Sequence, residues 1–369
     1  MSVFETSVQV FLAPVLKYLK DESVTEIMIN GPQNIFIERK GFVEKVDAKF
    51  EDENSLMAAV RNISQFVGRP IDNEHPFLDA RLPDGSRIHA VVPPIARNGT
   101  TVAIRKFSKD RLALKDLISR GTLTADAARF LDVCLYLKKN IIVSGGTGTG
   151  KTTILGIMAS RVQPGQRIVV LEDSAELKVH SDHVVFFEAR PADEFGKGQV
   201  TLRDLVKSSL RLRPDRVIVG EVRSAEALDL ISSMNTGHSG SMGTVHSNNP
   251  KECLIRLETL ALMSETTVPV QAVRAQVAAA INIVLQLSRM QDGSRKVTHI
   301  SEGLGMDLNG NYKTQDIYLF EQTGRDQDGK VLGDLKATGA IPTFMREIEV
   351  NQLPFTRDMI TKKDPPKAA

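Results

Sequence analysis

Residues 141–152 read Ile-Ile-Val-Ser-Gly-Gly-Thr-Gly-Thr-Gly-Lys-Thr, and this stretch decides the fold. Ile141–Val143 is an apolar run typical of a buried strand, and apolar residues within 154–158 recur with the spacing of a helix face. A strand, a glycine loop and a helix in this order are the context in which the pattern GxxxxGK[ST] binds phosphate. Gly145–Thr152 is therefore predicted to hold the triphosphate of a nucleotide.

The chemistry of this loop follows from its glycines and from the helix that begins after it. Glycines let successive N–H groups point inward, and the helix N-terminus adds the positive end of its dipole. Lys151 is predicted to reach the β- and γ-phosphates, and the Thr152 hydroxyl to hold Mg²⁺. The full set predicted to contact the nucleotide is Gly145, Gly146, Thr147, Gly148, Thr149, Gly150, Lys151, Thr152 and Thr153. The alternative, a flexible loop that matches by chance, is disfavoured by the flanking strand and helix.

The amino-acid composition narrows the possible class, location and partners of the protein only modestly. The 369 residues favour two domains, and Lys+Arg 47 against Asp+Glu 45 gives no global preference for nucleic acid or an acidic partner. No apolar run approaches the length of a membrane span, and the first residues lack a secretory pattern. Cys134 and Cys253 lie in apolar contexts, which predicts reduced core residues in a cytoplasmic protein. A metal site made of protein side chains alone is not expected.

The pattern of elements predicts an α/β protein of two parts. Residues 1–105 read as a small N-terminal α+β domain, 106–118 as a linker, 119–355 as a doubly wound P-loop domain, and 356–369 as a disordered tail. The predicted elements are a hairpin at 27–38, a helix at 55–67, strands at 87–92 and 101–107, parallel strands at 141–144, 168–171, 184–187 and 217–219, and an antiparallel extension at 281–287 and 297–301.

Two carboxylates follow predicted parallel strands, where ligands of open α/β sheets bind. Glu172 comes directly after one strand and is predicted to orient or deprotonate the attacking water. The alternative there is an acidic N-cap for the turn that follows, a role that Asp173 or Ser174 could fill. Glu221 ends another strand and is predicted to serve the metal, directly or through water. Its alternative is an ordinary ion pair with Arg223.

Two further pairs of residues are candidates by position. His238 and His246 lie in a segment rich in glycine and serine, where an imidazole could report the γ-phosphate and move the loop. Arg87 and Arg105 lie in two strands before the linker and could act as arginine fingers, worth about 10³–10⁵ in rate. The alternative for these arginines is pairing with carboxylates such as Asp84.

These motifs together resemble the secretion ATPase superfamily of type II and type IV secretion and type IV pili. The P-loop, the acidic stretch Arg167–Leu177, the Walker B stretch Leu210–Arg223 and the histidine stretch Thr236–His246 occur in the family's order. Val24–Gly31, Leu82–Arg87 and Leu212–Arg216 are most similar to CpaF-like ATPases of tight-adherence (Flp) pilus assembly. The likeness runs from about Val15 to Arg346.

The resemblance implies an ATP hydrolase that uses Mg²⁺, with a RecA-like motor domain in a ring-shaped homohexamer at the inner face of the inner membrane. It implies that Glu172 is the catalytic carboxylate, that Glu221 is the Walker B acid, and that Arg87 and Arg105 reach the nucleotide. The implied partner is an inner-membrane platform protein, and no nucleic acid is expected. The chain departs from the family in lacking the tetracysteine motif of the type II branch and the extra N-terminal segment of many CpaF-like proteins.

Three alternatives stay open from sequence. One is the ATPase of a conjugative type IV secretion system. Another is a nucleic-acid translocase, against which stand the absence of tryptophan and an aromatic content of 5%. The third is a scaffold that binds ATP and hydrolyses it too slowly to do work.

Overall fold

The computed structural model describes residues 3–39, 41–106, 112–193, 196–264 and 268–361. The chain divides into two compact units, Met1–Arg111 with Ala192–Lys197 and Leu112–Pro191 with Gly198–Ala369. Within the described ranges, no helix has both the length and the apolar character that crossing a bilayer requires.

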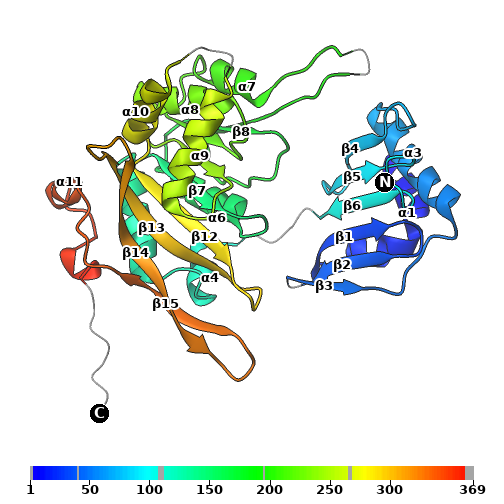
Figure 1. Ribbon diagram of the computed structural model, residues 1–369, viewed down its shortest axis with the longest axis horizontal. Coiled ribbons are helices and arrows are strands. Elements are labelled where there is room, and N and C mark those ends of the chain that lie inside the picture. The colour runs from blue at the N-terminus through cyan, green and yellow to red at the C-terminus, as the bar shows by residue number, and fades with distance from the viewer. Residues whose placement is uncertain (1–2, 40, 107–111, 194–195, 265–267, 362–369) are drawn as a thin grey trace. The chain divides into compact units, whose positions relative to one another are not determined.

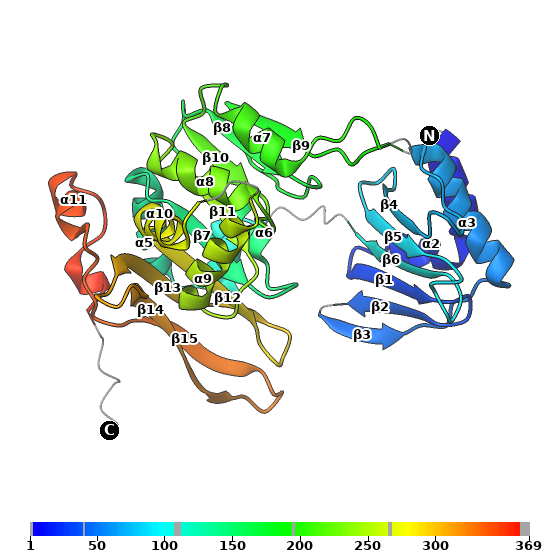
Figure 2. The same ribbon diagram turned by 45° about the horizontal axis from the view of Figure 1, so that its top comes forward.

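The first unit is built on an antiparallel sheet of six described strands in the order β3-β2-β1-β6-β5-β4 (Figure 2). The strands are β1 (Val24–Asn30), β2 (Ile35–Arg39), β3 (Phe42–Lys45), β4 (Phe77–Arg81), β5 (Arg87–Val91) and β6 (Thr101–Arg105). The helices are α1 (Val3–Phe11), the 3-10 turn η1 (Ala13–Val15), α2 (Leu16–Lys20) and α3 (Glu53–Val67). The β1–β2 pair confirms the predicted hairpin.

Helix α3 begins and ends where its sequence dictates. The Asp52 side chain accepts a hydrogen bond of 2.8 Å from the Ser55 backbone N–H, which is a capping box. The helix ends at Gly68, whose φ of +66° is readily adopted only by glycine. The rings of Phe4 in α1 and Phe66 in α3 stack with centroids 4.5 Å apart.

The second unit is built on a mixed sheet of nine described strands in the order β15-β14-β13-β12-β7-β11-β10-β8-β9 (Figure 2), and the antiparallel strands β13–β15 lie side by side in Figure 1. The strands are β7 (Ile141–Gly145), β8 (Ile168–Glu172), β9 (Val184–Glu188), β10 (Arg216–Val219), β11 (Met242–Val245), β12 (Ile283–Arg289), β13 (Arg295–Met306), β14 (Tyr312–Arg325) and β15 (Val331–Ala337). β12 through β9 run parallel, and β13–β15 continue antiparallel from β12.

Helices cover both faces of this sheet, so its parallel strands are apolar on both sides. The helices are α4 (Leu114–Ser119), α5 (Ala125–Tyr136), α6 (Lys151–Ala159), α7 (Leu202–Ser209), α8 (Glu226–Asn235), α9 (Pro250–Leu262), α10 (Val270–Ala280), α11 (Met345–Val350) and the 3-10 turn η2 (Arg357–Met359). Ile141 and Val143 pack into the core that α5, α6 and α11 complete, whereas Ile142 packs into the core of α7–α10.

The predicted α/β class and the predicted parallel strands are confirmed, as is the antiparallel extension. Residues 107–111 of the predicted linker 106–118 lie outside the described residues, and α4 begins inside the linker range. Within the tail expected to be disordered from residue 356, residues 357–359 instead form η2, and Ile360 after it is buried at 2% exposure. Residues 362–369 lie outside the described residues. Cys134 and Cys253 are buried and form no disulfide.

Candidate nucleotide site

The candidate site lies where four neighbouring parallel strands end. β7, β11, β10 and β8 are adjacent in that order, and their registers place Ser144 beside Val245 and Val219 beside Leu171. Because the strands are parallel, the residues that follow them emerge at one edge of the sheet. The P-loop follows β7, His246 follows β11 and Glu221 follows β10, while Glu172 is the last residue of β8.

The P-loop has the backbone that a phosphate cradle requires. Gly148 and Gly150 have φ of +70° and +96°, which side chains rarely allow, and α6 begins directly after Gly150. Gly145 packs so closely that a Cβ there would lie 2.6 Å from the Leu287 carbonyl oxygen. The glycines are therefore needed for conformation and for close approach, and the N-terminus of α6 opens into this loop.

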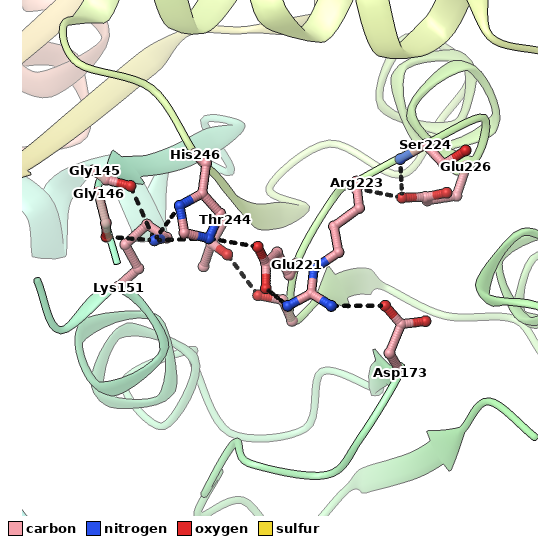
Figure 3. Close-up of polar contacts among 11 residues, drawn as sticks. Gly145, Gly146, Lys151, Asp173, Glu221, Arg223, Ser224, Glu226, Thr244 and His246 are labelled. Carbon is pink, nitrogen blue, oxygen red and sulfur yellow. Dashed lines mark hydrogen bonds and ion pairs between the residues drawn. The ribbon is translucent and has the colours of Figure 1, made fainter. Parts of the chain in front are cut away.

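Lys151 is held at the centre of the loop (Figure 3). Its Nζ donates to the carbonyl oxygens of Gly145 at 2.9 Å and Gly146 at 2.8 Å, and its side chain is buried. The same Nζ lies 3.5 Å from both ring nitrogens of His246. The ammonium group is therefore already desolvated and directed at the cradle that the sequence predicted it would serve.

Glu221 connects the histidine to a second cation. Its Oε1 lies 2.7 Å from His246 Nε2, and its Oε2 accepts a hydrogen bond from Arg223 Nη2. Burial alone would raise the pKa of Glu221, but the Arg223 hydrogen bond and the charges around it lower that pKa below its ordinary value. Burial and the Lys151 charge lower the pKa of His246. A neutral imidazole that accepts from Lys151 at Nδ1 and donates to Glu221 from Nε2 fits these contacts.

Glu172 is the most deeply buried carboxylate of the site, at 3% exposure. Its Oε1 accepts hydrogen bonds of 2.8 Å from the backbone N–H groups of Glu176 and Leu177. Burial raises its pKa despite these two bonds. A carboxylate with a raised pKa that is fixed by two amides is suited to take a proton from water. The predicted alternative, an acidic cap for the following turn, is present as well, because Glu172 itself accepts hydrogen bonds from two backbone amides of that turn.

The structure separates the two candidate histidines. His246 joins Lys151 and Glu221, whereas His238 precedes β11 and so lies at the opposite edge of the sheet from the P-loop of the same chain. The His238 carbonyl accepts a hydrogen bond of 2.7 Å from Ser241, and its Nδ1 is buried with no hydrogen-bond partner among the described residues. The structure therefore does not bring His238 to the predicted phosphate site.

A buried arginine holds this opposite edge together. Arg216 begins β10 with no exposed surface, and its guanidinium donates to the carbonyls of Leu135 at 2.5 Å and Gly240 at 3.0 Å and to Gln166 at 2.7 Å. Burial lowers its pKa to about 10. Arg216 therefore fixes the loop that contains His238.

In the first unit, Arg87 and Arg105 lie directly opposite each other on β5 and β6. The same register places Arg81 of β4 opposite Arg87, so three arginines form one row across the sheet. Glu26 of β1 lies opposite Arg105 in turn, so a carboxylate follows the three arginines in this row, and the Arg105 charge acts on it. Asp84, the predicted alternative partner, accepts from the Ser86 amide and hydroxyl at 2.9 Å each.

Two threonines complete the predicted set. Thr152 is half-buried in the first turn of α6, and Thr153 is exposed. Mg²⁺ takes six oxygen ligands, and with nucleotide phosphates and water the Thr152 hydroxyl and the Glu221 carboxylate fit that donor set. The conformation of the cradle and the chemistry of these donors therefore fit a magnesium nucleotide.

Sequence reasoning missed one part of this arrangement and named another only as an alternative. Arg81 is identified only by strand register, because no local motif marks it. Arg223 was noted only as a possible partner of Glu221, and that pair is present in the structure, together with a contact to Asp173 at 3.9 Å. The short spacing of Glu221 and Arg223 was the signal available in the sequence.

Comparisons with known proteins agree with this geometry. The family model of the type II/IV secretion system protein matches residues 9–326. The conjugal transfer protein TrbB of Rhizobium radiobacter is 32% identical over 310 residues, which cover 82% of this chain and 91% of TrbB. The type IV secretion system protein VirB11 of Brucella suis biovar 1 is 31% identical over 327 residues, which cover 80% of this chain and 89% of VirB11.

One solved structure shows the same fold at low identity. The ATPase DotB of Legionella pneumophila aligns with a TM-score of 0.55 and 18% identity over 78% of this chain and 79% of DotB. The chain belongs to the type II/IV secretion system protein family. Its membership makes it a P-loop ATP hydrolase with an N-terminal domain and a RecA-like domain, as the sequence predicted.

Proposed function

We propose that this member of the family is a homohexameric motor that hydrolyses ATP with Mg²⁺ at the cytoplasmic face of the inner membrane. The observation that carries the proposal is the convergence of Lys151, Glu172 and Glu221 at the ends of neighbouring strands. The motor would power either the assembly of a pilus or the secretion of a substrate. In both cases it would act on an inner-membrane platform protein. Contact with the membrane would be made through such partners.

Binding begins with the anion site at the start of α6. The backbone N–H groups at the start of the helix and the positive end of the helix dipole attract phosphate oxygens. Lys151 Nζ exchanges its bonds to the carbonyls of Gly145 and Gly146 for bonds to the β- and γ-phosphates, which are stronger because both partners are charged. The loop therefore keeps this cation in place until the nucleotide arrives.

Hydrolysis requires a base and compensation of the developing charge. Glu172 would orient the attacking water and take its proton, while the amides of Glu176 and Leu177 keep its Oε1 in place. Mg²⁺ bound with the nucleotide neutralises phosphate charge, and Thr152 and Glu221 would hold it. His246 lies between Lys151 and Glu221 and would report the state of both.

The arginine row supports a shared site in a ring. Arg87 and Arg105 would stabilise the transition state of the nucleotide, with Arg81 beside them in register. The resemblance to the family implies that arginines of the N-terminal domain reach the nucleotide, and we propose that here they act on the nucleotide of a neighbouring subunit.

The identity of the machine is a finer proposal. Val24–Gly31 and Leu82–Arg87 support the tight-adherence pilus, and the relatives TrbB and VirB11 support the conjugative type IV alternative. The neighbouring reading frames decide between them, since pilin and platform genes would name a pilus and conjugation genes would name a transfer system.

Calorimetry of ATP binding tests the site itself. We expect the wild type to bind Mg²⁺–ATP and Lys151→Ala to bind it about tenfold to a hundredfold more weakly, the value of a charge-assisted hydrogen bond. Equal affinities would contradict the assignment of the cradle. ATP turnover with and without single-stranded DNA then separates the motor from a nucleic-acid translocase, because strong stimulation by DNA would favour the translocase.

A further inference from the structure

A series of polar and charged side chains connects the P-loop to the end of β8 (Figure 3). Lys151 Nζ lies 3.5 Å from the ring nitrogens of His246, whose Nε2 lies 2.7 Å from Glu221 Oε1. Glu221 Oε2 accepts from Arg223 Nη2, and Arg223 Nη1 lies 3.9 Å from Asp173 Oδ2. Arg223 therefore lies between the carboxylates that follow β10 and β8.

The backbone of Arg223 is fixed while its side chain is accessible. The buried Glu226 accepts hydrogen bonds from the backbone N–H groups of Arg223 at 2.5 Å and Ser224 at 2.8 Å. The Arg223 side chain is 53% exposed. Its guanidinium can therefore exchange partners without any change in the main chain that positions Glu221.

We propose that Arg223 is the counter-cation of Glu221 in the metal-free site and that it leaves Glu221 when Mg²⁺ enters with the nucleotide. The inference rests on the proposed function of this site. A divalent cation at Glu221 would lie close to the guanidinium that Oε2 now holds, and two cations so close would repel each other. Asp173 is the second carboxylate in reach of the displaced side chain.

The exchange has a measurable consequence for affinity. Binding of a magnesium nucleotide must break the Glu221–Arg223 pair, whereas binding of a metal-free nucleotide to the cradle leaves the pair intact. Removal of the Arg223 charge therefore favours the magnesium complex alone. The dissociation constant of the metal-free nucleotide, divided by that of the magnesium nucleotide, should therefore rise when the charge is removed. A general loss of structure would weaken both complexes and would not raise this ratio.

The experiment measures ADP binding to the full chain by calorimetry, once with Mg²⁺ and once with EDTA. Arg223→Gln should bind Mg²⁺–ADP about fivefold more tightly than the wild type, the scale of one partly exposed ion pair, and metal-free ADP equally well. Arg223→Lys keeps the charge and should stay near the wild type. Arg203→Gln is the matched control, because Arg203 forms an ion pair with Asp229 at 2.8 Å between α7 and α8.

The other outcomes are distinct. An unchanged ratio in Arg223→Gln would overturn the inference, because Arg223 would then not compete with the metal. Weaker binding of Mg²⁺–ADP would also overturn it and would make Arg223 a ligand of the nucleotide or a support for Glu221. A wild type that binds ADP in neither condition would remove the proposed function and this inference with it.

Discussion

Gly220 makes room for Glu172. A Cβ at Gly220 would lie 2.8 Å from Glu172 Cγ and 3.2 Å from its Oε1, and Gly220 has no backbone conformation that requires glycine. The glycine before Glu221 is therefore explained by the neighbouring strand, whose final side chain lies against it.

This contact predicts the effect of Gly220→Ala. The added methyl group should displace Glu172 and lower ATP turnover about a hundredfold, since a small misplacement of a catalytic group has that effect. The affinity for ATP should be unchanged because the P-loop is untouched. Steady-state kinetics with calorimetry measure both, and full turnover would show that Glu172 tolerates the shift.

Glu172→Gln should lower turnover about 10²–10⁴-fold and stabilise the fold near neutral pH. Burial holds the pKa of Glu172 above its ordinary value, so as pH rises the unfolded chain loses this proton first and stability falls. Glutamine has no proton to lose. The gain in melting temperature should therefore grow as pH rises from the ordinary pKa of glutamate to the raised folded value, and then stay constant.

Melting curves of the wild type and Glu172→Gln between about pH 4 and about pH 8 check this sign. A difference in melting temperature that shrinks as pH rises would contradict it. Normal turnover in the variant would instead assign the base to another residue.

Gly240→Ala should destabilise the second unit more than Gly237→Ala does. Both glycines have positive φ, +87° and +105°, so both substitutions strain the backbone. Only a Cβ at Gly240 would also lie 2.4 Å from Nη1 of the buried Arg216, whereas nothing lies within 4 Å at Gly237. In urea unfolding, Gly240→Ala should lose about 1–3 kcal/mol more free energy of unfolding than Gly237→Ala. Equal losses would mean that the Arg216 side chain moves aside without cost.

Mixtures of Arg105→Ala and Lys151→Ala chains should recover part of the ATPase activity that each lacks alone. If arginines act on a neighbouring subunit, about one quarter of the interfaces in a randomly mixed ring keep both residues. Activity measured across mixing ratios should peak near equal amounts. Mixing that recovers nothing at any ratio would place Arg105 with the nucleotide of its own chain.

The sequence predicted those parts of the molecule that local patterns specify. The strand, loop and helix around Lys151 were readable because glycine and apolar spacing carry the information. β14 and β15 were missed because their exposed residues interrupt the apolar alternation. The row that includes Arg81 depends on register between strands, and the position of His238 depends on strand order. Neither the register nor the strand order can be predicted from a single segment of the sequence, because both depend on pairing between distant segments.

Because Arg87 and Arg105 lie opposite each other on neighbouring strands, their pairing is sensitive to insertions and deletions within those strands. Successive residues of a strand point to opposite faces, so inserting one residue into β6 would turn Arg105 to the far side of its sheet and leave Arg87 where it is. Insertions and deletions tolerated in this family should therefore avoid β5 and β6 and accumulate in the loops that join them to other elements.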